Sequence, residues 1–176
     1  ASDTHGLRFD RCRVPEDPLL GERGQGFRQF MSILDDGRIA IAALAVGVLQ
    51  ACLEESTHDA GNRTSFGRPI GSYQAVAFSI ADIEVMAEAA RLLTYKAAWL
   101  KDTGQAYRHA AARAKLYATE SAVSATRMAT QIFGGAGFLD DTLVARHYRD
   151  AKVLEIGEGT SEIQRIVIAR GLGLDV

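Results

Sequence analysis

The chain has 176 residues, of which 47% are hydrophobic and 24% charged, and its formal net charge is −2. This length suits one domain with its own core, and the charge gives no electrostatic footprint for nucleic acid or an anionic membrane. Two distant cysteines, Cys12 and Cys52, form neither a disulfide framework nor a metal-ligand spacing, so we expect a reducing compartment. We predict no membrane span, because no run of about 18 apolar residues is uninterrupted.

Residues 7–14 alternate apolar and polar side chains, which is typical of a β-strand, and Pro15 ends the pattern. A lone strand is unstable. It therefore either packs as an arm on the helices or belongs to a sheet in sequence outside this chain, and we favour the second. We assign residues 1–20 to the end of a β-domain and its linker, and residues 21–176 to a C-terminal helical domain.

Apolar residues recur at steps of three and four over residues 27–60, which predicts a long helix. Gly37 and Gly47 interrupt it, and each costs about 1 kcal/mol relative to alanine, so we expect another backbone or a ligand to approach closely there. After a turn-rich loop at 62–71, a second helix is predicted over residues 72–103. Its apolar residues lie on two faces, which favours more than one neighbour, including another copy of the chain.

A third helix, rich in Ala, Ser and Thr, is predicted over residues 106–133 and ends at a glycine cluster, 134–137. A short fourth helix follows over about residues 140–153, and a last helix ends at Arg170. The predicted fold class is therefore all-α. We expect an antiparallel, up-down bundle of three long and two shorter helices, with a short N-terminal strand.

The candidate catalytic group is Glu158, which stands between Gly157 and Gly159 directly after a short apolar run, 153–156. Ser161 and Gln164 form a capping-box pattern, so a helix start is predicted just after the glutamate. Glycines let a backbone pass close to another object, and helix N-termini offer free N–H groups to a ligand. Glu158 is a candidate general base, and the alternative is a helix cap with a solvated carboxylate.

Other residues carry weaker signals. Asp35 and Asp36 precede Gly37 and lie near Arg38, and they either face a ligand or form an exposed charge group. Arg63 beside Phe66 either binds a phosphate and stacks a ring or belongs to a polar loop. The histidines have no metal-ligand spacing, so no metal site is expected.

Eight motifs, taken together and in order, resemble the C-terminal domain of the acyl-CoA dehydrogenases, flavoproteins that oxidise an acyl-CoA to its 2-enoyl product. Each motif is weak by itself, but their shared order and spacing are specific, and they cover nearly the whole chain. The N-terminal strand resembles the end of the middle β-domain of that family. The motifs lie at residues 34–39, 63–70, 73–74, 88–92, 114–116, 131–138, 149–152 and 158–165.

The resemblance implies FAD as cofactor and acyl-CoA as substrate. Glu158 matches the base that removes the α-proton while the β-hydride passes to flavin N5, and its backbone N–H matches a group that polarises the thioester carbonyl. Some family members carry the base on the first helix, at the position that Gly37 occupies here. A glycine has no side chain that could act as a base, so Glu158 is the better candidate. Asp35, Arg38 and Gly159 are implied on the CoA and acyl side. The implied FAD contacts are Arg63, Phe66, Gln131 and Gly135, toward the FAD of a neighbouring subunit, together with Gln74, Thr160 and Glu162.

The resemblance also implies a homo-oligomer, a dimer or tetramer, with electron-transfer flavoprotein as acceptor in fatty acid metabolism. We expect a cytoplasmic, bacterial protein with no nucleic-acid partner. An acyl-CoA oxidase or a non-catalytic oligomerisation module are the alternatives, and the isolated fragment is expected to be inactive. Gly157 replaces a tyrosine found in many relatives, and our hypothesis is a roomier pocket for a branched or cyclic acyl group.

Overall fold

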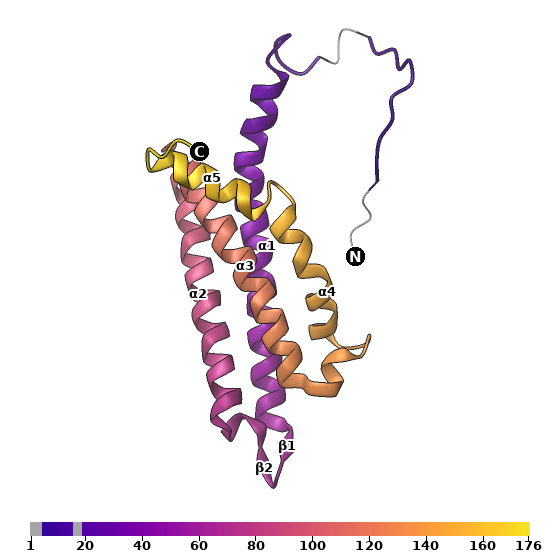
Figure 1. The fold of residues 1–176 in the computed structure, drawn as a ribbon, viewed down its shortest axis with the longest axis vertical. Helices are drawn as coiled ribbons and strands as arrows, with labels where there is room; N and C mark the ends of the chain where they lie inside the picture. Colours follow the sequence, from indigo (N-terminus) through magenta and orange to yellow (C-terminus); the bar gives the residue numbers. More distant parts are fainter. Residues whose placement is uncertain (1–4, 16–18) are drawn as a thin grey trace.

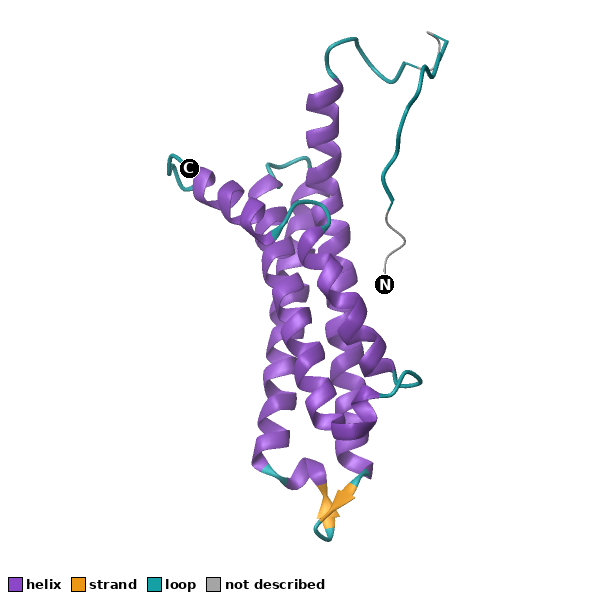
Figure 2. Ribbon diagram, turned by 45° about the vertical axis from the view of Figure 1, so that its right-hand side comes forward, coloured by secondary structure: helices purple, strands orange, loops and turns teal. Residues whose placement is uncertain are grey.

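A computed structural model describes residues 5–15 and 19–176. Within them, α1 (Gly26–Asn62), α2 (Gln74–Asp102) and α3 (Arg108–Phe133) run side by side as an antiparallel bundle (Figure 1). The shorter α4 (Leu143–Ile156) packs against α3 and α1, and α5 (Ser161–Gly171) crosses the end of the bundle and contacts α3. The all-α prediction of three long and two shorter helices is confirmed (Figure 2).

The centre of the bundle is α3, which contacts all four other α-helices. Its buried side is built of small residues, and alanine both favours helix and lets neighbouring backbones approach closely. This explains how one helix can pack against four others. The fully buried alanines of α3 are Ala111, Ala112, Ala114, Ala118, Ala122, Ala125 and Ala129.

The predicted bounds of the three long helices agree with the structure to within two residues at each end. The fourth helix differs, because it begins and ends about three residues later than predicted. Thr142 has extended backbone and its hydroxyl donates to the Leu139 carbonyl, which delays the start. The apolar run 153–156 is the last helical turn of α4.

The predicted strand at 7–14 does not form, because the described residues around it offer no strand to pair with it. Residues 5–15 run apart from the bundle and are exposed. Strands occur instead in the loop after α1, where β1 (Thr64–Ser65) and β2 (Arg68–Pro69) form a small antiparallel hairpin. Its two turn residues, Phe66 and Gly67, both have positive φ, at 50° and 80°, as a tight hairpin turn requires.

By length and composition, α1 could span a membrane, with a mean hydropathy of 1.6 over its most apolar window. Core helices of soluble proteins pass the same test. Here α1 contacts α2, α3 and α4, and its buried residues include Ala42, Ala45 and Leu49. Packing within this chain buries 28% of that apolar window, so much of the apolar surface of α1 stays exposed in the single chain.

Candidate active site

Glu158 lies in the tight turn that joins α4 to α5. Gly157 ends α4 with an ordinary extended backbone, at φ −61° and ψ 153°. The chain then turns through two positive φ angles, 54° at Glu158 and 90° at Gly159. A glutamate in this region is uncommon, and such backbone strain gathers at functional sites.

The predicted capping box at Ser161 and Gln164 is wrong by one residue. The residue that caps α5 is Thr160, whose hydroxyl accepts the N–H of Ile163 at 3.5 Å. Ser161 is buried inside the first turn, and Gln164 points back to the preceding turn. Glu162 accepts bonds from its own N–H and from Thr160, which lower the pKa of its carboxyl. Both predicted flavin-binding positions after the base thus lie at the α5 N-terminus.

Gly37 of α1 faces the Glu158 carboxyl group. A Cβ atom at position 37 would lie 2.7 Å from Glu158 Cδ and 3.2 Å from its Cγ, closer than side chains allow. A close approach, as expected, occurs at Gly37, but the approaching group is the side chain of the candidate base and not a backbone or a ligand. At Gly47 the expectation is wrong, because no atom lies within 4 Å of its Cβ position.

Arg38 and Asp35, one turn apart on α1, form an ion pair beside this contact. Arg38 is 1% exposed and the Asp35 side chain 18%, so this ion pair is largely buried. Burial lowers the pKa of its guanidinium, and the nearby Asp35 and Glu158 oppose that shift. Arg108, at the start of α3, approaches Asp35 at 3.7 Å. Asp35 and Arg38 thus lie near Glu158.

The neighbouring Asp36 ties α1 to the α2–α3 connection. It accepts the Tyr107 hydroxyl at 2.6 Å and pairs with Lys101 at 3.0 Å. These bonds lower the pKa of Asp36, and the same hydrogen bond raises the pKa of Tyr107 to about 12. The three groups fix the end of α2 and the start of α3 against α1.

Lys115 binds the backbone of the turn that carries Glu158, a role that sequence reasoning missed. Its side chain is fully buried, and its ammonium group donates to the carbonyls of Glu155 at 3.0 Å and Gly159 at 2.8 Å. Burial lowers the pKa of Lys115 to about 8. A sequence signal existed: Lys115 shares a helix face with Ala111, Ala118 and Ala122, and a lysine on an alanine face has to find partners.

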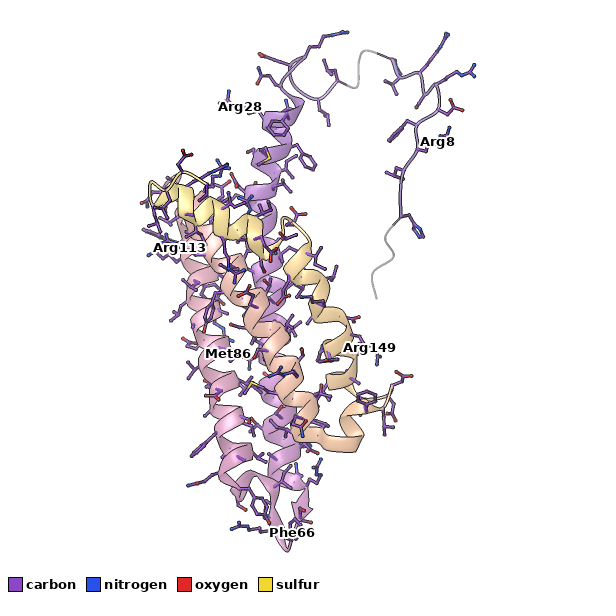
Figure 3. The ribbon with its side chains drawn as sticks, in the orientation of Figure 1. Arg8, Arg28, Phe66, Met86, Arg113 and Arg149 are labelled. Atoms are coloured by element: carbon purple, nitrogen blue, oxygen red, sulfur yellow. The ribbon has the colours of Figure 1, made fainter. Side chains whose placement is uncertain are left out.

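The other predicted cofactor residues lie at the opposite end of the bundle. Arg63 donates to the Phe133 carbonyl at 2.8 Å and pairs with Asp59 at 3.3 Å, which places its guanidinium beside the glycine cluster. Phe66 lies at the hairpin tip and is 96% exposed (Figure 3). The remaining three, Gln74, Gln131 and Gly135, are also exposed at this end.

One chain therefore carries two separate groups of predicted site residues. Gly37 and Arg63 are 26 residues apart along α1, which corresponds to about 39 Å of helix. The structure brings Glu158, Gly159, Thr160, Asp35 and Arg38 to one region, with Glu162 on the following turn. It does not bring them to the hairpin end.

The helical bundle and its glutamate-bearing turn together indicate a helical domain that forms part of a longer enzyme. The family model described as "Acyl-CoA dehydrogenase, C-terminal domain" matches residues 24–173, and the chain belongs to this family. It is 50% identical over 171 residues to probable acyl-CoA dehydrogenase YngJ of Bacillus subtilis, covering 97% of this chain and 45% of that protein. It is 48% identical over 168 residues to human mitochondrial short-chain specific acyl-CoA dehydrogenase, covering 96% and 41%.

Solved structures agree with the assignment. Butyryl-CoA dehydrogenase from Megasphaera elsdenii matches with a TM-score of 0.89 at 43% identity, over 92% of this chain and 42% of that one. PigA with FAD and proline matches with a TM-score of 0.91 at 34% identity, over 94% and 43%. The chain spans less than half the length of these relatives.

Proposed function

We propose that this chain is the catalytic C-terminal domain of an FAD-dependent acyl-CoA dehydrogenase, in which Glu158 removes the α-proton of an acyl-CoA thioester. The observation that carries the proposal is the placement of the Glu158 carboxyl group against the Gly37 gap of α1. A carboxylate held in a glycine-flanked turn can work as a base near neutral pH. We place the boundary with the preceding β-domain near residue 20.

The backbone of the same turn supports this role. In the described part of the chain, the N–H of Glu158 donates to no backbone carbonyl, unlike that of Gly157, which bonds the Val153 carbonyl at 2.9 Å. The free N–H can polarise the thioester carbonyl as an oxyanion-type donor while the carboxylate of the same residue takes the neighbouring proton. Arg38, Asp35 and the Gly159 backbone line the part of the site that binds the CoA and acyl groups of the substrate.

FAD, when bound, supplies the acceptor for the β-hydride. The hairpin end of the bundle has groups that suit a dinucleotide. The Arg63 guanidinium is held in place and can pair with a phosphate, and the Phe66 ring is exposed. A ligand can approach the Gly135 backbone closely, because no atom lies within 4 Å of its Cβ position. Gln74 and Gln131 add exposed amides. Thr160 and Glu162 serve the flavin at the other end. The two groups lie about 39 Å apart, so we infer that they serve the sites of different subunits.

A second copy of the chain would cover α2. Large apolar side chains lie exposed on this helix at every seventh position, which forms a stripe along one face. Exposed large apolar side chains gathered on one helix face favour an interaction site, and two-fold copies are the commonest partners of such a site. We therefore propose a homodimer or homotetramer. The residues of the stripe are Phe78, Val85, Leu92 and Trp99.

The relatives narrow the substrate and acceptor that we propose. Several are named for short-chain or butyryl-CoA substrates, so we propose a short acyl-CoA, with extra room at Gly157 for a branched group. A chain described as the electron transferring flavoprotein of Acidaminococcus fermentans matches with a TM-score of 0.93 at 44% identity, and we propose an electron-transferring flavoprotein as acceptor. We place the enzyme in fatty acid metabolism in a bacterial cytoplasm, where the free thiols of Cys12 and Cys52 stay reduced.

The test is a panel of straight and branched acyl-CoAs on the full-length protein, with Glu158→Gln and, as a matched control, Glu84→Gln on the exposed face of α2. Glu158→Gln should stop turnover and α-proton exchange while CoA-ester binding is retained, and Glu84→Gln should leave all three unchanged. Exchange at the wild-type rate in Glu158→Gln would refute the proposal. Peroxide formed in air without another acceptor would instead favour an oxidase, a chemistry named for a relative described as a prolyl acyl carrier protein oxidase.

We expect the 176-residue chain by itself to retain little FAD and to be inactive, because the two groups of contacts lie at opposite ends of the bundle. Absorbance of the purified chain at the flavin band measures this. A yellow preparation with stoichiometric flavin would contradict the expectation.

A further inference from the structure

Lys115 is a buried charge whose partners are all backbone carbonyls. It is 0% exposed, and among the described residues no carboxylate lies within ion-pair distance of its ammonium group. Burying an ammonium group is costly unless its donors are satisfied. Here two donors are satisfied, by the carbonyls of Glu155 and Gly159 at 3.0 and 2.8 Å. An arrangement this costly calls for a reason beyond filling the core.

The two carbonyls bracket Glu158. The Glu155 carbonyl belongs to the last turn of α4, where unpaired carbonyls and the helix dipole favour a cation. The Gly159 carbonyl directly follows the candidate base. Lys115 therefore joins the backbone before Glu158 to the backbone after it, from a helix about 40 residues away in sequence.

Gln164, which follows the turn in the chain, also binds its carbonyls. Its side-chain amide donates to the Gly159 carbonyl at 2.8 Å and to the Glu158 carbonyl at 3.3 Å. Gln164 is fully buried, as Lys115 is. The carbonyls of the turn thus point inward to α3 and α5. Because each peptide unit is planar, the directions of the Glu158 and Gly159 carbonyls also fix the opposite directions of the Gly159 and Thr160 N–H groups.

These bonds explain why the turn can keep its unusual conformation. Positive φ at a non-glycine residue such as Glu158 costs on the order of a kcal/mol and persists only where the surroundings over-determine it. Lys115 is charged at neutral pH even though burial lowers its pKa to about 8, and the Glu155, Glu120 and Glu158 carboxylates oppose that shift while Arg38 adds to it. Hydrogen bonds from a charged donor are about twice as strong as neutral ones.

We propose that Lys115, together with Gln164, is a positioning residue that locks the turn at 157–160, so that the Glu158 carboxylate stands against Gly37. This assignment rests on the proposed function, because positioning matters only if Glu158 is the base. It differs from a purely structural role for Lys115, which would change folding and ligand binding together.

The experiment uses full-length, FAD-loaded protein and the variants Lys115→Met, Gln164→Met and Glu158→Gln. Lys152→Met is the matched control, because this lysine is exposed on α4 and pairs with the Glu155 side chain instead of a turn carbonyl. The readouts are kcat, KM, CoA-ester binding and α-proton exchange into deuterated water. Lys115→Met should lower kcat and exchange alike by about 100-fold, which is the cost of an ångström-scale misplacement of a reacting group. KM should stay within about threefold, and Lys152→Met should match wild type.

Two outcomes separate this proposal from the proposed function. If Glu158→Gln is inactive but folded Lys115→Met exchanges at the wild-type rate, the positioning role is overturned and the base assignment stands. If Glu158→Gln itself exchanges at the wild-type rate, both fail. A joint loss of FAD, CoA-ester binding and kcat in Lys115→Met indicates a structural role and also overturns the proposal.

Should Lys115→Met not fold, Gln164→Met decides. It removes the second anchor of the same carbonyl and leaves the buried charge in place. We expect a loss in kcat of about tenfold with KM and CoA-ester binding unchanged. Wild-type kcat in the folded Gln164→Met protein would refute the role of the pair.

Discussion

The two glycines that flank Glu158 should respond to alanine in opposite ways. Gly159 has φ +90°, which alanine rarely adopts, and a Cβ atom there would lie 3.0 Å from the Gln164 amide nitrogen and 3.3 Å from Ile163 Cγ2. Gly157 has φ −61° and ψ 153°, which any residue adopts, and its Cβ would lie 3.5 Å from the Val153 carbonyl oxygen. One substitution therefore strains the turn and the other does not.

The magnitudes follow from this geometry. Gly159→Ala stores about 1–3 kcal/mol of backbone strain, and displacing the Gln164 amide weakens bonds worth about 1 kcal/mol. We expect a loss of about 2–4 kcal/mol in unfolding free energy. Gly157→Ala should instead stabilise by about 0.4–1 kcal/mol, because it narrows the unfolded ensemble. Movement of the turn in Gly159→Ala should also lower kcat by about 100-fold, whereas Gly157→Ala keeps kcat near wild type.

Thermal and urea unfolding of the full-length variants measure the first effect, and kcat with a fixed acyl-CoA measures the second. Equal stability and equal kcat in the two alanine variants would refute the reasoning, because it depends on a strained turn on one side of Glu158 alone. Loss of stability in Gly157→Ala would show that the turn is held differently from the geometry described above.

The remaining predictions use the same comparison of matched sites. Gly137→Ala should destabilise by about 1–3 kcal/mol in thermal unfolding, because its Cβ would lie 2.6 Å from a backbone oxygen of α3, whereas Gly135→Ala, with nothing within 4 Å, should not. Unfolded Lys115 has a pKa near 10.5 and folded Lys115 about 8, so the unfolded state binds more protons between these values. The unfolding free energy of wild type relative to Lys115→Met should therefore rise from pH 8 to 10.5, by up to about 1.4 kcal/mol per pH unit. Gly37→Ala should fold normally, since only a flexible carboxyl group must move, but lose about tenfold in kcat, because that group is the proposed base, and Gly47→Ala should keep full activity.

Local sequence patterns predicted the helices well because the helical period is strong over long segments. Three apolar and alanine-rich stretches fixed the long helices to within two residues, and a glycine at position 37 correctly indicated a close approach. No strand forms at 7–14 within this chain, because an alternating segment becomes a strand only beside a partner, and the favoured interpretation places that partner in sequence outside the chain. The cap of α5 was displaced by one residue because Thr160 and Ser161 are both good capping residues, and only the turn geometry chooses between them.

The support of the candidate base could not be read from spacing. Lys115 bonds carbonyls 40 and 44 residues away, and a backbone carbonyl leaves no mark in the sequence. The predicted helix already separates Arg63 from Gly37, but the sequence does not show that Glu158 packs at the Gly37 end. Both facts come from the packing of α4 and α5 onto α3.

The placement of these groups divides the chemistry of the domain between its two ends. The turn that carries Glu158 is fixed by α1 through Gly37, by α3 through Lys115 and by α5 through Gln164, all within one chain. The base can therefore be held in place by this domain's own packing. At the hairpin end Arg63 is held by Asp59 and the Phe133 carbonyl, but Phe66 and Gly135 are exposed. Under the proposed function, substitutions at the first end should lower kcat within each subunit, whereas substitutions at the second should weaken FAD binding in the neighbouring one.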